Sequence, residues 1–64
     1  MDAKTKREYI KAVNKISNDK ISKKIKGIMS TAVNNSKTLD DAMARVARDA
    51  PEHVNQFLKI IGVE

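Results

Sequence analysis

The sequence predicts an all-α fold, a compact four-helix mini-bundle that forms a single domain over residues 1–64. Three observations support this prediction. Apolar residues recur at the i, i+3, i+4 and i+7 spacing that lines one face of a helix. Capping and turn-forming residues separate these stretches, which predicts helices over about 3–16, 18–34, 38–49 and 51–61. The chain has no cysteine, so neither a disulfide nor a zinc–thiolate site can hold it together, and helix packing must stabilise it.

The helix expected over 3–16 has two possible N-terminal caps. Asp2 can accept the first free amide, or Thr5 and Glu8 can form a capping box. The apolar face consists of Tyr9, Ile10, Val13 and Ile16. A basic ridge beside it consists of Arg7, Lys11 and Lys15. Like charges at this i, i+4 spacing repel by a few tenths of a kcal/mol per pair, and an anionic ligand would relieve that repulsion.

The helix expected over 18–34 follows a short turn at Ser17, Asn18 and Asp19, all good capping residues. Its apolar stripe consists of Ile21, Ile25, Ile28, Met29 and Ala32. Its lysines point away from that stripe, and a short turn would bring them close to the end of the first helix. Gly27 costs about 1 kcal/mol relative to alanine inside a helix. A glycine at this position allows either a close helix crossing or a bend in the helix, and we favour the crossing.

Local chemistry also sets the remaining boundaries. Asn34, Asn35 and Ser36 should end the second helix, because asparagine tolerates the left-handed conformation that closes helices. Thr38 caps the third helix, with Asp41 three residues later. The apolar stripe of this third helix consists of Leu39, Ala42, Met43, Val46 and Ala50.

The last helix should begin at Pro51, because proline ends one helix and fits the first position of the next. Its apolar face consists of Val54, Phe57, Leu58 and Ile61. Phe57 is the expected centre of the core, and Gly62 should terminate the helix, with Val63 folding back in a Schellman-type contact.

Charge is distributed unevenly along the chain. Residues 1–26 hold nine lysines and arginines against three acids, a net charge of +6, whereas residues 27–64 hold four against five, a net charge of −1. This asymmetry predicts an anionic partner at one end of the molecule, although a solvated lysine face that keeps a small protein soluble is the alternative. The candidate phosphate-binding residues are Arg7, Lys11, Lys15, Lys20, Lys23 and Lys24.

The sequence argues against an enzyme, a cofactor or a metal site. It has no glycine-rich phosphate loop and no nucleophile paired with a base, and so short a chain is expected to lack space for a substrate pocket. His53 lies near Asp49 and Glu52, but Pro51 breaks their helical spacing and no second histidine completes a metal shell. We therefore expect no small-molecule substrate.

Three other binding modes are disfavoured. A helix-turn-helix reader would need base-reading side chains on the last helix, which offers only His53, Asn55, Gln56 and Lys59. Single-strand stacking needs exposed aromatic rings, and Tyr9 is the sole candidate. Neither a signal peptide nor a membrane span is expected, because no long apolar run occurs, and the second helix lacks the Trp or Phe of a membrane-surface helix. The expectation is a cytoplasmic protein that contacts phosphates with little sequence specificity.

Two family resemblances add to this reading. Four short helices ending in Leu58-Lys59-Ile60-Ile61-Gly62-Val63 resemble a trimmed helicase-and-RNase-D C-terminal (HRDC) domain, and also small helicase-associated proteins of large tailed phages. The resemblance implies structure-dependent DNA binding in support of a recombination, repair or replication helicase, in the host cytoplasm if the protein is phage-encoded. The family domain is longer and has more helices.

The second resemblance is local and belongs to a different class. Val46, Arg48, Asp49, Pro51, Glu52, His53 and Phe57, within VARDAPEHVNQF, are similar to a segment of the theta subunit of bacterial DNA polymerase III. It implies the alternative function, a protein-interaction module that acts as a theta-like accessory subunit of a replication or proofreading complex.

Overall fold

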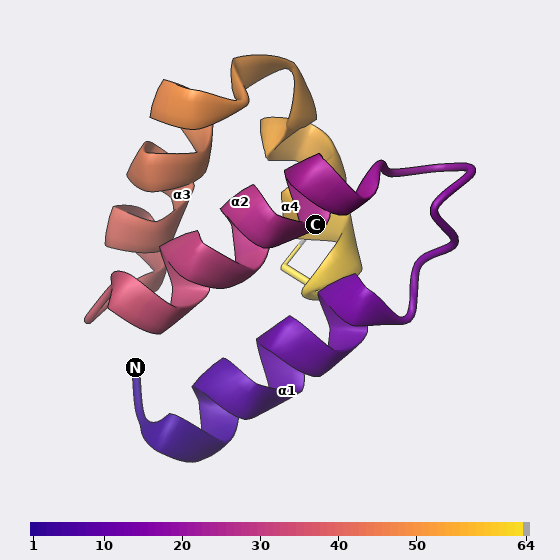
Figure 1. The fold of residues 1–64 in the computed structure, drawn as a ribbon. Helices are drawn as coiled ribbons and strands as arrows, with labels where there is room; N and C mark the ends of the chain where they lie inside the picture. The colour runs from indigo at the N-terminus through magenta and orange to yellow at the C-terminus, as the bar shows by residue number, and fades with distance from the viewer. Residues whose placement is uncertain (64) are drawn as a thin grey trace.

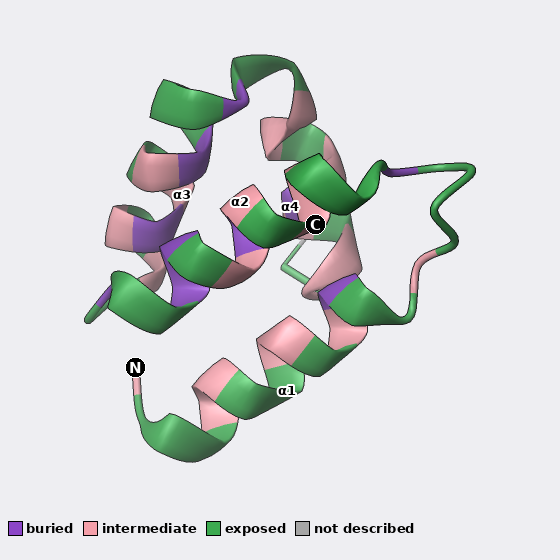
Figure 2. Cartoon of the chain, in the orientation of Figure 1, coloured by how far each residue is buried: buried purple, intermediate pink, exposed green. Residues whose placement is uncertain are grey.

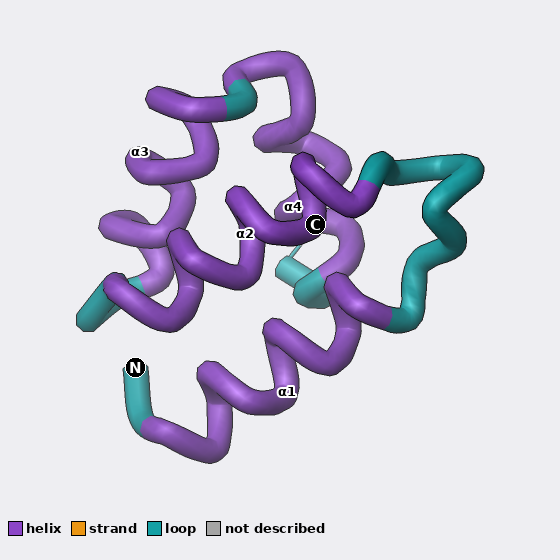
Figure 3. The backbone as a smooth tube through the Cα atoms, in the orientation of Figure 1, coloured by secondary structure: helices purple, strands orange, loops and turns teal. Residues whose placement is uncertain are grey.

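Residues 1–63 are described by a computed structural model, and all regular secondary structure within them is helical (Figures 1 and 3). The elements in chain order are α1 (Ala3–Asn14), α2 (Lys23–Asn35), α3 (Leu39–Asp49), the 3-10 turn η1 (Pro51–His53) and α4 (Val54–Ile60). Helix α2 packs against α1 on one side and α3 on the other, while α4 packs against α1 and α3. The predicted all-α four-helix bundle is confirmed.

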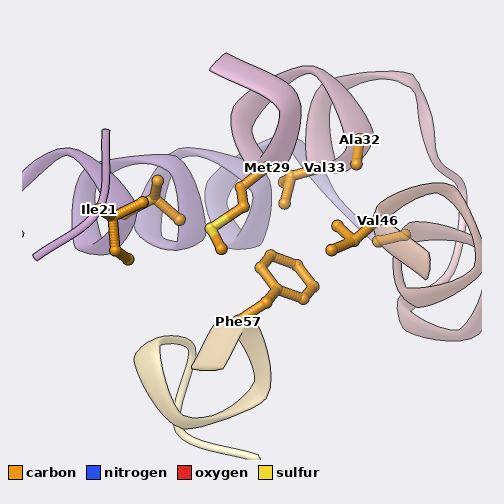
Figure 4. Close-up of a cluster of buried hydrophobic side chains, with 8 residues drawn as sticks. Ile21, Met29, Ala32, Val33, Val46 and Phe57 are labelled. Atoms are coloured by element: carbon orange, nitrogen blue, oxygen red, sulfur yellow. The ribbon is translucent and has the colours of Figure 1, made fainter. Parts of the chain in front are cut away.

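The core lies where the four helices meet, with most of the outer surface exposed (Figure 2). Phe57 is completely buried, and its ring points toward Met29, Val33 and Val46 (Figure 4). Side chains from α1, α2, α3 and α4 therefore share one core, and the prediction that Phe57 lies at its centre is confirmed.

Two predicted N-terminal caps are present. Asp2 accepts a hydrogen bond from the Thr5 amide at 2.7 Å, so Asp2 caps α1. Thr38 accepts one from the Asp41 amide at 3.1 Å and caps α3. Each side-chain oxygen pairs with an amide that has no partner inside its helix.

The second helix begins later than predicted. Helix α1 ends at Asn14 and α2 begins at Lys23, capped by Ser22, so residues 15–22 form a loop instead of a short turn. Ser17 organises the loop, because its hydroxyl accepts from the Asp19 amide and its carbonyl accepts from the Lys20 and Ile21 amides. Ile21 is buried although it lies in the loop, which explains why its spacing continues the apolar stripe of α2.

Two further expectations for α2, a left-handed asparagine at its C-terminus and a close crossing at Gly27, are wrong. The helix ends at Asn35, within the stretch predicted to end it, but no asparagine there has a positive φ. The C-cap residue Ser36 is extended, and its buried hydroxyl donates to the Ala32 carbonyl. Gly27 makes no close crossing, because it is exposed and a Cβ added there would meet nothing within 4 Å. Helix α2 also continues without interruption through Gly27.

The C-terminal boundaries agree closely with the sequence. Helix α3 ends at Asp49 and Pro51 opens the next element, although its first turn is the 3-10 turn η1 and α4 itself begins at Val54. Gly62 has a positive φ of 82°, and the Val63 amide donates to the Leu58 carbonyl at 3.0 Å. This is the backbone pattern of a Schellman motif, as predicted, although the Val63 side chain is half exposed.

Candidate nucleic-acid interface

The basic ridge of α1 lies on its exposed face. Arg7 and Lys11 line a shallow depression of about 500 Å³ together with Lys4, which lies one turn before Arg7. Sequence reasoning omitted Lys4, although its i, i+3 relation to Arg7 places it on the same face. Glu8 also lines this depression and is the one acid within it.

The loop and the start of α2 extend the basic surface. Asn14 lines both the α1 depression and a second one of about 490 Å³, whose lining includes Lys23 and Lys26. The two depressions are therefore neighbours that meet at the end of α1. Lys15 and Lys20 are exposed in the connection between the two helices and line neither depression.

Lys24 belongs to a different part of the surface. It lines a groove of about 330 Å³ between α2 and α3, together with Arg45 and Arg48. The six candidate residues are thus not one patch: Arg7 and Lys11 share a depression, Lys23 lies in the adjacent one, and Lys24 faces α3.

Ion pairing differs between the two halves of the molecule. Within residues 1–63, every ion pair between an arginine or lysine and an acid lies in the C-terminal half: Arg45 with Asp41 at 3.4 Å and Arg48 with Asp49 at 3.1 Å. The His53 Nε2 also lies 3.9 Å from the Glu52 Oε1. None of the six candidate residues pairs with an acid within residues 1–63.

The first turn of α2 adds to the positive potential. Lys23, Lys24 and Lys26 lie there and no acid accompanies them, although a helix N-terminus carries a partial positive charge. This arrangement opposes helix stability and favours an anion.

Two other lysines make contacts within the fold. The Lys6 Nζ donates to the Asn34 carbonyl at 3.0 Å, which links α1 to the last turn of α2. The Lys26 Nζ donates to the Asn18 Oδ1 at 2.7 Å, which attaches the loop to α2. A sequence pattern cannot distinguish these structural lysines from the exposed ones, because both contacts depend on tertiary packing.

The charged groups of α3 are engaged with each other. A hydrogen bond from Arg48 lowers the pKa of Asp49, and the same hydrogen bond raises the pKa of Arg48. Both groups are exposed, so this pairing is screened by solvent and contributes little to stability.

His53 has ordinary structural partners. Its Nδ1 lies 2.9 Å from the Gln56 Oε1, and its Nε2 is near Glu52. No three His, Cys, Asp or Glu side chains of residues 1–63 come together in a group that could hold a metal ion.

None of the helices in residues 1–63 combines the length and the apolar character needed to cross a membrane. Comparisons with family models, curated proteins and solved structures find no match to this chain. The case for any function therefore depends on the surface described above.

Proposed function

We propose that this protein binds nucleic acid, without enzymatic activity, through phosphate contacts from the basic surface of α1, the following loop and the start of α2. The residues are Arg7, Lys11, Lys15, Lys20, Lys23 and Lys24, to which we add Lys4. One observation carries the proposal: none of these side chains has an acidic partner within residues 1–63, whereas the cations of α3 do. Unpaired lysines and arginines bind phosphates by releasing condensed counterions.

The arrangement favours backbone contacts over base stacking. Tyr9 is half-buried and packs against the core, so its ring is not available as a stacking platform. Lysine ammonium groups act as point charges and do not select a base. Binding should therefore show little sequence preference.

The biological setting that we propose follows the HRDC resemblance: an accessory to a helicase in DNA recombination, repair or replication. A theta-like protein-interaction module is the competing possibility. No contact among the described residues favours this module, so we treat it as the alternative that the experiment below can select.

The test is an NMR titration of the ¹⁵N-labelled protein with a single-stranded oligonucleotide, its duplex and a branched junction. We expect the largest amide shifts at Arg7, Lys11 and Lys23, and a loss of binding in Lys11→Glu. Lys59→Glu is the matched control, because Lys59 is exposed on α4, lines none of the three depressions described above and makes no ion pair within residues 1–63. Absence of shifts with all three DNAs would exclude the proposal and leave the protein-interaction module.

A further inference from the structure

The groove between α2 and α3 has a chemistry different from that of the α1 surface. Its volume is about 330 Å³, and it runs between two helices instead of along one. The residues that define it are Lys24, Gly27, Ile28 and Thr31 of α2 and Arg45 and Arg48 of α3.

The floor of the groove is apolar and open. Ala32 is buried and Ile28 is half-buried, so both present hydrocarbon at the base of the groove. Gly27 adds no side chain, and a Cβ there would meet nothing within 4 Å. A partner can therefore approach the backbone of α2 closely at this point. The fold makes no use of this glycine for packing.

The rim of the groove is cationic. Lys24, Arg45 and Arg48 line it, and Asp49 is the one carboxylate among the lining residues. Arg48 donates to Asp49 through its Nε and Nη2, which leaves its Nη1 for another acceptor. A guanidinium group carries five donor hydrogens, so pairing with one carboxylate does not exhaust it.

We propose that the α2–α3 groove binds a short acidic, amphipathic peptide segment of a partner protein. An apolar side chain of that segment covers Ile28 and Ala32, while carboxylates meet Lys24 and Arg48. Charge complementarity and the apolar floor together specify this occupant.

The acids of α3 favour a peptide over a nucleic-acid strand in the groove. Asp49 lines the groove, and Asp41 lies beside Arg45. A phosphate backbone carries a charge at every nucleotide and would meet these carboxylates, whereas a peptide can place its acids only opposite the cations. The acidic peptide and the nucleic acid would thus bind different faces of α2, and Lys24 is the one cation that both proposals use.

The experiment uses the full chain, labelled with ¹⁵N, and a synthetic peptide of alternating glutamate and leucine pairs with blocked ends. We expect amide shifts at Gly27, Thr31 and Arg48. Gly27→Leu should weaken binding by about tenfold or more, because its side chain would occupy the groove. Leucine is a better helix former than glycine, so this variant should fold. Thr31→Glu, which adds a negative charge at the rim, should also weaken binding and serves as a second variant.

The controls separate this proposal from the nucleic-acid site. Lys11→Glu should weaken oligonucleotide binding and leave peptide binding unchanged. A peptide with lysine in place of glutamate, and one with alanine in place of leucine, should both bind at least tenfold more weakly.

Several results would overturn the groove proposal. One is the absence of amide shifts at millimolar peptide, and another is a set of shifts concentrated at Arg7 and Lys11. A third is that the control peptides bind as tightly as the glutamate–leucine peptide. Preferential binding of an oligothymidylate in the groove would also overturn it and assign the groove to nucleic acid.

Discussion

Both halves of this small bundle are helical, but they differ in whether their basic side chains are paired with acids. In the half that contains α3, η1 and α4, arginines lie beside aspartates and are paired with them. In the half that contains α1, the loop and the start of α2, the net charge is +6 for residues 1–26, from nine basic residues against three acids, and none of these charged side chains forms an ion pair with another residue of 1–63. Unpaired like charges reduce the stability of their own helices, so their accumulation on one side supports the proposal of an anionic partner.

Both halves nevertheless depend on one core, and the largest expected effect comes from breaking it. Phe57 is fully buried and faces side chains from α2 and α3. Phe57→Ala should lower the free energy of unfolding by roughly 3 to 5 kcal/mol, which a bundle of this size can hardly withstand. Urea denaturation followed by circular dichroism measures the change.

Phe57→Leu is the matched control, because it keeps an apolar side chain and should lose less stability. If the helices of the basic half kept their amide protection in Phe57→Ala while α3 and α4 lost theirs, the two halves would be independent units and the single-core description would be wrong.

The next effect concerns the charges themselves. For about four simultaneous phosphate contacts, the slope of log K against log salt should be near −3 to −4, and Lys11→Ala should make it shallower by about one on every sequence tested. Binding isotherms at several salt concentrations measure the slope.

Lys59→Ala should leave the salt dependence unchanged. Arg45 and Arg48 are less suitable as controls than Lys59, since they share a groove with Lys24. If neutralising the C-terminal cations weakened binding more than neutralising the α1 set, the interface would lie near Pro51 instead.

Features governed by local chemistry were predictable from the sequence. Thr38 and Asp2 cap helices because their side chains satisfy nearby amides, and Pro51 fixes a boundary because it has no amide hydrogen. The start of α2 was not predictable, because Ile21 is buried from a loop and so extends the helical spacing of apolar residues. Periodicity reports which residues are buried, not the backbone that carries them.

The candidate site was predictable only as a set of exposed cations. Exposure of Arg7 and Lys11 follows from their position outside the apolar face of α1. The separation of Lys24 from them depends on how α2 packs against α3, which no spacing along the chain encodes. The structural roles of Lys6 and Lys26 depend on tertiary contacts in the same way.

The smallest expected effect compares the two glycines, one inside α2 and one just after α4. Gly27 and Gly62 both have open space where a Cβ would lie, but only Gly62 has a positive φ. Gly27→Ala should therefore raise the free energy of unfolding by about 0.5 to 1 kcal/mol, because alanine favours the helix and restricts the unfolded chain. Gly62→Ala should lower it by about 1 kcal/mol, because an L-residue is strained in the left-handed region. Thermal and urea denaturation of the two variants measure both changes. A destabilising Gly27→Ala would mean that α2 meets a neighbour at this position, and the open groove beside α3 would then be closed in solution.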